Sequence, residues 1–210
     1  MLVGTGLTFR EIVMSDPLPK GTIQQAVIHF LDGRDDAALF GAMAVNAYVD
    51  ERRMTEDVGI VSSRAKELAE ELKEHLSQRF RIAVRIRTVG DGVGYRLYQR
   101  AQPRNRHLVD LRSVEALPAT QRIDGVLVLT PTNIIAGKVN AYYRRKGKPK
   151  AGTDWRDLAH LLLKFPELKT EEGPVKERLE AEGVGQEVLA IWRGLVAEEI
   201  LPEEEDEEFL

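Results

Sequence analysis

The chain has no cysteine, only four histidines and no long hydrophobic run. Without cysteine it can form no disulfide, thiolate zinc site or iron–sulfur cluster, and it can use no cysteine nucleophile. The histidines do not occur at the spacing of a helical zinc motif, so a histidine-rich metal site is not expected. No hydrophobic segment approaches a membrane span, and the first residues lack the basic region of a signal peptide. We therefore expect a cytoplasmic protein with no membrane association.

The composition is that of a folded protein. Of its 210 residues, 43% are hydrophobic and 30% are charged, which suffices for one domain with a hydrophobic core. Its 30 basic and 34 acidic residues give a net charge of -4, which argues against a generic cationic nucleic-acid binder. A local basic patch is still compatible with this balance, because several arginines occur between residues 81 and 106.

The hydrophobic pattern predicts an α+β protein in which strands precede residue 130 and helices follow it. Helical spacing predicts helices over 23–31, 42–49, 65–76, 175–182 and 186–200, and two more that begin near 131 and 153. Short or alternating hydrophobic runs predict strands over 37–40, 58–61, 82–88, 94–100, 107–111 and 123–129. We divide the chain into an N-terminal arm (1–21), an α/β core (22–130), a helical C-terminal region (131–201) and an acidic tail (202–210), which is expected to be solvated.

The most informative segment runs from residue 40 to residue 61 and reads FGAMAVNAYVDERRMTEDVGIV. It resembles the minimal nucleotidyltransferases of the polymerase-β-like superfamily, the group that includes the AbiEii-type toxins of toxin–antitoxin systems. Their pattern is an apolar strand, Gly-Gly or Gly-Ser, a short helix, Arg-x-Thr/Ser-x-Asp, an apolar residue and then Asp or Glu. The corresponding residues here are Phe40-Gly41-Ala42 and Arg53-Met54-Thr55-Glu56-Asp57-Val58-Gly59.

The resemblance continues to about residue 165. The third carboxylate of the family lies in a Val-Asp-Leu strand, which corresponds here to Asp110. The family then has a helix with Lys and Ala, an Arg, a basic loop and a D-x-x-D-L helix. The matching residues are Lys138, Ala141, Arg144, Lys148 and Asp154-Trp155-Arg156-Asp157-Leu158. The resemblance implies a small mixed sheet flanked by helices and followed by a helical region.

The resemblance also implies a chemistry. Nucleotidyl transfer uses Mg²⁺ ions that bridge the attacking and leaving oxygens, and Mg²⁺ prefers carboxylate, phosphate and water ligands. Asp57 and Asp110 are therefore the expected metal-binding and catalytic residues. A glycine turn before a helix lets backbone amides approach phosphate, and basic side chains neutralise its charge. The expected nucleotide-binding residues are Gly41, Ala42, Arg53, Thr55, Lys138 and Arg144.

The sequence departs from the family pattern at two positions. Gly59 stands where the second carboxylate of the pair is expected, and Ala42 replaces the second residue of the Gly-Gly or Gly-Ser turn. Glu56 is no substitute, because neighbouring residues of a strand point to opposite faces. We therefore expect a degenerate or weak nucleotidyltransferase that binds nucleotide and holds Mg²⁺ weakly.

Two other functions fit the sequence. The first is an active Mg²⁺-dependent transferase, toxin-like, with an RNA or protein acceptor. The second is a non-enzymatic module that binds a protein partner or a second copy through the apolar face of residues 188–196. Structural roles also compete at each position: Asp110 could pair with Arg112 or Arg53, and Arg53 and Thr55 could simply fix a loop. Lys138 and the basic segment 144–150 would, on the plainest reading, be solvated.

Overall fold

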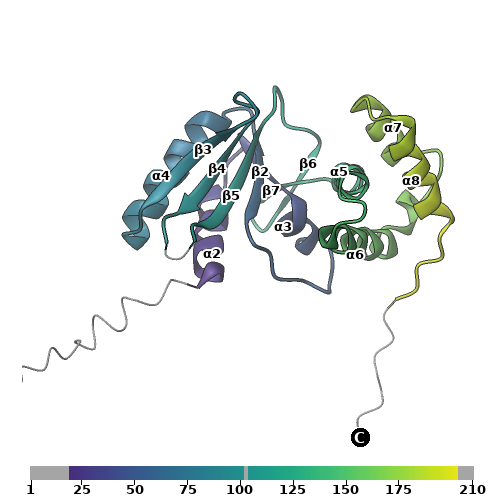
Figure 1. Cartoon of the computed structure of the whole chain (residues 1–210), viewed down its shortest axis with the longest axis horizontal. Helices are drawn as coiled ribbons and strands as arrows, with labels where there is room; N and C mark the ends of the chain where they lie inside the picture. The colour runs from purple at the N-terminus through teal and green to yellow at the C-terminus, as the bar shows by residue number, and fades with distance from the viewer. Residues whose placement is uncertain (1–18, 102–103, 203–210) are drawn as a thin grey trace, which may run out of the picture.

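The computed structural model describes residues 19–101 and 104–202. Seven strands form one mixed sheet in the order β3-β4-β5-β2-β1-β7-β6 (Figure 1). The strands are β1 (Ala37–Phe40), β2 (Val58–Ser62), β3 (Val84–Val89), β4 (Gly94–Gln99), β5 (Arg106–Ser113), β6 (Thr120–Ile123) and β7 (Val126–Leu129). The α-helices are α2 (Lys20–Leu31), α3 (Gly41–Asn46), α4 (Ala65–Phe80), α5 (Pro131–Arg144), α6 (Pro149–Lys164), α7 (Pro174–Ala181) and α8 (Gln186–Ala197). The predicted α+β class is confirmed.

Helices α2 and α4 pack together and cover the part of the sheet formed by β2 to β5 (Figure 1). In α4 the side chains repeated at helical spacing, including Leu68, Leu72 and Leu76, are fully buried. Helix α3 begins directly at the end of β1 and contacts α5 and α6. Helices α7 and α8 in turn pack on α5. Within the described residues, no helix has both the length and the hydrophobicity to span a bilayer.

The centre of the sheet fixes the neighbours of the family motif. Strand β2 lies between β1, to which it is antiparallel, and β5, to which it is parallel. Gly59 is therefore opposite Phe40 on one side and opposite Asp110 on the other. On the far side of β5, Asp110 pairs with Arg96, and Arg96 pairs with Arg87. One row of residues thus crosses five strands of the sheet.

A β-bulge between β4 and β5 changes the direction of one side chain. The register shifts at Leu97 and Tyr98, so that Val109 pairs with Leu97 and His107 with Tyr98. Leu108 and Val109 are consequently both buried, whereas His107 is only partly buried. Bulges re-aim side chains in this way and are frequent beside functional sites.

Several predicted elements need correction. The single strand expected over 123–129 is a hairpin of β6 and β7, turned by Asp124 and Gly125 with φ of 46° and 83°. Little of the basic segment 144–150 is a loop, because α5 reaches Arg144 and α6 begins at Pro149. Helix α6 therefore begins before the start expected near residue 153. Most of the expected N-terminal arm and of the acidic tail lies outside the described residues.

Candidate functional site

The two predicted metal carboxylates belong to neighbouring parallel strands. Asp57 immediately precedes β2, and Asp110 lies within β5 beside Gly59. Both side chains are half-buried. The side chains of the two aspartates are influenced by a common cation, because Arg96 forms an ion pair with Asp110 and also acts electrostatically on Asp57.

Asp57 has a partner that the sequence motif did not indicate. Nδ1 of His107 lies 2.9 Å from Oδ2 of Asp57, and Nε2 of the same ring lies 3.1 Å from the carbonyl oxygen of Val109. The ring also stacks on Tyr98, with 4.9 Å between centroids. The hydrogen bond from His107 lowers the pKa of Asp57, and this outweighs the opposing effect of burial. Both ring nitrogens therefore lie within hydrogen-bond distance of an accepting oxygen.

Asp110 is paired with arginine. Nε of Arg96 donates to Oδ1 of Asp110 at 2.9 Å, and Nε of Arg112 lies 3.9 Å from Oδ2. The Arg112 guanidinium stacks on the ring of Phe40, 4.2 Å from its centroid. The ion pair between Asp110 and Arg112 that the sequence suggested is therefore present, but it is long. Arg96 is the main partner of Asp110.

Gly59 leaves no room for a side chain. A Cβ atom built there would lie 2.8 Å from the carbonyl oxygen of Phe40 and 3.1 Å from its ring. The Phe40 ring thus occupies the space next to Asp110 toward which a side chain at position 59 would extend. The glycine turn expected before a helix is present at Gly41. This residue has a φ of 73°, a conformation that favours glycine, and it is the first residue of α3.

Arg53 and Thr55 fix the loop that leads to Asp57. Both Nε and Nη2 of Arg53 donate to the carboxylate of Asp157 in α6, at 2.6 and 2.7 Å. The hydroxyl of Thr55 donates to the carbonyl oxygen of Asp57 at 3.0 Å and accepts from Gln24 at 3.1 Å. The structural role considered for these two residues is therefore visible in their contacts.

Lys138 belongs to a buried ionic network. Its Nζ donates to Asp154 at 3.2 Å and to Asp157 at 2.5 Å, and Asp154 also accepts from Arg145 at 2.6 Å. Side chains of Lys138, Asp154 and Asp157 are 9%, 2% and 1% exposed, so the expectation of a solvated lysine is wrong. Burial by itself would raise the pKa of Asp157, but Arg53 and Lys138 outweigh it and lower that pKa.

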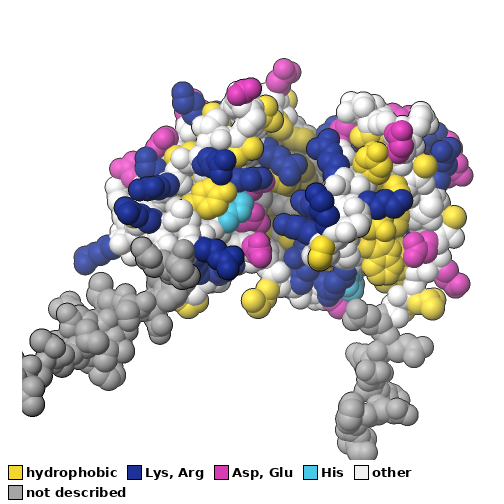
Figure 2. All heavy atoms as spheres, in the orientation of Figure 1, with side chains coloured by type: hydrophobic (Ala, Val, Ile, Leu, Met, Phe, Trp, Pro, Cys, Tyr) yellow, Lys and Arg dark blue, Asp and Glu magenta, His cyan; other side chains and the backbone are white. Residues whose placement is uncertain are grey.

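Basic side chains surround the two aspartates. Arg144 is exposed at the end of α5 and forms no ion pair with any residue of the described segments. Partial desolvation lowers the pKa of Arg112, and the charges of Arg145, Arg144 and Arg96 lower it further. Lys150 acts electrostatically on Asp57. Figure 2 shows many Lys and Arg side chains on the face that includes the front strands and the helices α5 and α6 of Figure 1.

The residues present do not fit a two-metal centre. Within 19–101 and 104–202, no three or more of the side chains His, Cys, Asp and Glu lie close enough together to hold a metal ion. One of three expected carboxylates is replaced by Gly59, and the other two already have partners, Arg96 for Asp110 and His107 for Asp57. His107 and Arg96 each occupy one carboxylate oxygen, so fewer oxygens are left to bind Mg²⁺.

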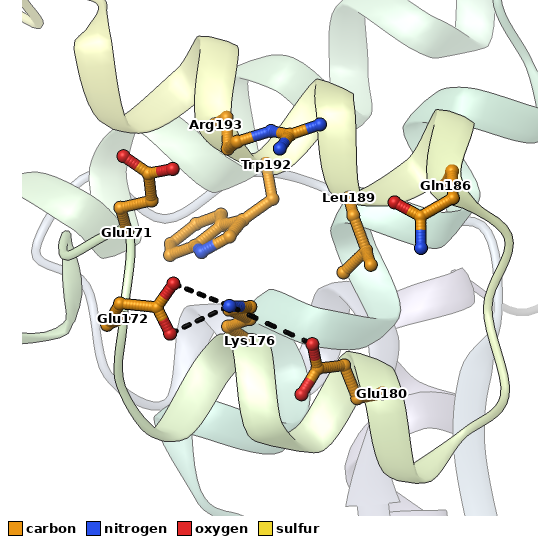
Figure 3. A pocket seen from close by; sticks show the side chains of 8 residues that line it. All are labelled: Glu171, Glu172, Lys176, Glu180, Gln186, Leu189, Trp192 and Arg193. Atoms are coloured by element: carbon orange, nitrogen blue, oxygen red, sulfur yellow. Dashed lines mark hydrogen bonds and ion pairs between the residues drawn. The ribbon is translucent and has the colours of Figure 1, made fainter.

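A separate small pocket lies in the helical region (Figure 3). It has a volume of about 150 Å³ and lies between α7 and α8, away from β2 and β5. Its walls are Glu171, Glu172, Lys176, Glu180, Gln186, Leu189, Trp192 and Arg193. Lys176 is held there by Glu172 at 2.5 Å, and Trp192 is almost fully buried. None of the predicted site residues lines this pocket.

Comparison with known proteins agrees with this architecture. A Megavirus polyadenylate synthase has a similar structure, with a TM-score of 0.57 and 14% identity over 70% of this chain. The chain spans only 32% of that enzyme, and the likeness shows a shared fold. A putative nucleotidyltransferase from H. pylori (TM-score 0.46, 12% identity, 90% and 96% of the two chains) is also similar. So is an antigenic nucleotidyltransferase-like protein from Paracoccidioides brasiliensis (TM-score 0.46, 18% identity, 83% and 91%).

The curated proteins contain no significant match to the sequence. The family model "Nucleotidyl transferase AbiEii toxin, Type IV TA system" matches residues 26–207, which is nearly the whole chain. This range takes in both carboxylate strands, the loop with Arg53 and the buried network around Lys138. The chain belongs to the AbiEii nucleotidyltransferase family.

Proposed function

We propose that the chain is a nucleotide-binding member of this family whose transferase activity is weak or lost. The nucleotide would bind over the turn at Gly41 and Ala42, beside Asp57 and Asp110, with Arg144 against the phosphates. The observation that carries the proposal is the row Phe40–Gly59–Asp110–Arg96. In it, a ring and a guanidinium occupy the space around Asp110 that an active metal centre needs for carboxylates and metal ions.

The surroundings support nucleotide binding more than catalysis. Arg96, Arg112, Arg144 and Lys150 bring an excess of positive charge to the two aspartates. Such charge favours a polyanion, and the glycine turn provides close backbone approach. Catalysis would additionally require the attacking and leaving oxygens to be bridged by metal ions, for which only two carboxylates are available.

The first experiment is calorimetric titration of ATP and CTP into the protein, with and without Mg²⁺ or Mn²⁺. Arg144→Ala is the site variant, and Arg79→Ala is its matched control, because Arg79 is also an exposed arginine in the last turn of a helix. We expect binding that Arg144→Ala weakens and Arg79→Ala leaves unchanged. Absence of binding under every metal condition would contradict the proposal.

The second experiment measures incorporation of labelled nucleotide into RNA and protein acceptors. We expect little or none. Robust Mg²⁺-dependent incorporation that disappears in Asp57→Asn would show an active transferase and would contradict the proposed weak or lost activity. Gly59→Asp is no clean repair of the site, because any side chain at position 59 meets the Phe40 carbonyl oxygen at 2.8 Å.

A further inference from the structure

Each aspartate of the site is already paired with a side chain of the protein. Nε of Arg96 is 2.9 Å from Asp110, and Nδ1 of His107 is 2.9 Å from Asp57. Arg112 lies on the other side of Asp110, at 3.9 Å, and is held in position by its stack on Phe40. These partners come from β4 and β5, so the sheet itself fixes their positions.

We propose that the guanidinium groups of Arg96 and Arg112 replace the divalent cation, so that this site binds the phosphates of a nucleoside triphosphate without Mg²⁺. The inference rests on the proposed nucleotide binding. It adds that guanidinium groups of the protein, and not Mg²⁺, bind the phosphates. Guanidinium groups suit this role, since their planar donors match phosphate oxygens and they stay protonated in proteins.

The geometry leaves donors available for the phosphates. Arg112 is bound to Asp110 only loosely, and its stack on Phe40 fixes the plane of the guanidinium without using its N–H groups. Phe40 directly precedes Gly41, so Arg112 lies at the turn where the phosphates are expected. Arg144 and Arg145 repel Arg112, and a polyanion placed among these arginines would relieve that repulsion.

The far end of the same row of the sheet also carries an excess of positive charge. Arg96 lies directly opposite Arg87 on β3, a like-charge pair that is unfavourable without an anion between or above the two. Asp110 forms an ion pair with only one of these two arginines, Arg96. A bound phosphate would therefore complete a charge arrangement that the folded chain leaves incomplete.

The test is ATP binding by calorimetry in EDTA and in excess Mg²⁺. In the wild-type protein we expect affinity in EDTA to equal or exceed that in Mg²⁺, because Mg²⁺ covers the phosphate oxygens that the arginines bind. Arg112→Ala should weaken metal-free binding by roughly tenfold or more, as expected for a lost hydrogen bond to a charged group. Arg79→Ala, which removes another arginine stacked on a phenylalanine, should have no effect.

Two further variants separate this inference from an ordinary metal site. Asp110→Asn removes the carboxylate that competes for Arg96 and Arg112, so it should tighten metal-free binding; a metal ligand at this position would instead weaken binding when removed. Arg96→Ala frees Asp110 and should make the remaining binding respond to Mg²⁺. If Arg112→Ala does not fold, Asp110→Asn and Arg96→Ala still test the inference, because both change the charge that Arg96 and Arg112 present.

The outcomes are distinguishable. Wild-type binding that occurs only with Mg²⁺ and is lost in Asp110→Asn overturns the inference and leaves the proposed nucleotide site intact. No ATP binding in either buffer overturns both. Metal-free binding that depends on Arg112, together with tighter binding by Asp110→Asn, supports both.

Discussion

At the scale of single residues, the site is shaped by what lies beside Gly59. The sequence already indicated that a carboxylate of the family motif is missing at position 59. The reason why no side chain is tolerated there becomes visible only in the pairing of β2 with β1. The Phe40 carbonyl oxygen and ring approach position 59 from across the strand. Gly59 is therefore both the departure from the family motif and a requirement of local packing.

Gly59→Ala should lower the free energy of unfolding by about 1–3 kcal/mol, the usual cost of overpacking. The new Cβ would lie 2.8 Å from a backbone oxygen, and relief requires movement of a strand. Chemical denaturation measures the effect. Gly152→Ala in α6 is the matched control, because its Cβ would enter open space and alanine favours a helix by about 0.5–1 kcal/mol. Equal stability of Gly59→Ala and the wild type would contradict the packing described for Phe40.

The pair of Asp57 and His107 predicts a pH dependence. The folded-state pKa of Asp57 is depressed below its ordinary value of 3.8, first by the hydrogen bond from His107. Stability from this pair is therefore complete above the ordinary pKa and is lost as the pH falls through the depressed pKa. Asp57→Asn should destabilise the protein by roughly 1 kcal/mol at neutral pH, and its effect should shrink in acid.

Urea denaturation at neutral pH and at the lowest pH where the protein stays folded measures this difference. Asp91→Asn is a suitable control, since Asp91 lies in an exposed turn and the structure gives it no ion pair among the described residues. A cost of Asp57→Asn that stays constant, or increases, on acidification would contradict the assignment of His107 as the partner.

At the scale of elements, the buried network ties α5 and α6 to the loop before β2. Lys138 comes from α5, Asp154 and Asp157 come from α6, and Arg53 comes from the loop. The D-x-x-D-L motif was visible in the sequence, and so was the lysine that precedes it. Their mutual contact was not, because nothing in a helical pattern tells which charged side chain faces inward to a partner.

Asp157→Asn should destabilise the protein by about 3–5 kcal/mol, because Lys138 and Arg53 would lose the carboxylate that compensates their burial. Asp50→Asn is its matched control: Asp50 also pairs with a basic residue of α6, Lys164 at 2.7 Å, but on the surface. That variant should cost far less, because water screens the exposed pair. Thermal and chemical denaturation of both variants give the comparison, and similar costs for the two would refute the role of burial.

Much of the element order followed from hydrophobic periodicity, since α4 and the first two strands bury the side chains that their patterns indicate. The misses have local causes. The hydrophobic run 123–129 predicts one strand, but two successive positive φ angles at Asp124 and Gly125 make it a hairpin. His107 escaped notice because the bulge in β5 breaks the alternation that would place it. Arg96 was visible only as one of several arginines, and its pairing with Asp110 depends on the register of β4.

At the scale of the whole molecule, the described residues share one hydrophobic core. It extends from Ile23 in α2 through the sheet to Trp192 and Leu195 in α8. Tyr48 adds a polar link: its hydroxyl donates to the carbonyl oxygen of Leu129 at 3.0 Å, and its ring meets Phe165 edge to face. The sheet and the helical region are therefore expected to unfold as one unit.

Both tryptophans, Trp155 and Trp192, lie in the helical region, so their fluorescence reports on it alone. Hydrogen exchange of amides in β2 and β5 reports on the sheet. We expect the two probes to give the same denaturation midpoint, as a two-state transition requires. An earlier transition in fluorescence than in exchange would mean that the helical region unfolds independently, and the shared core would then contribute less than its burial indicates.

The contact between Phe40 and Gly59 also limits how this site can change. A carboxylate at position 59 cannot be introduced by one substitution without a shift of β1, since part of the obstruction is a main-chain oxygen that no mutation of Phe40 removes. Arg112 packs on the Phe40 ring, so a change at Phe40 would disturb a second residue. A third carboxylate therefore requires several coordinated changes, whereas the loss of Asp57 or Asp110 requires only one. The pairing of β1 with β2 thus makes this arrangement of side chains easier to reduce than to extend.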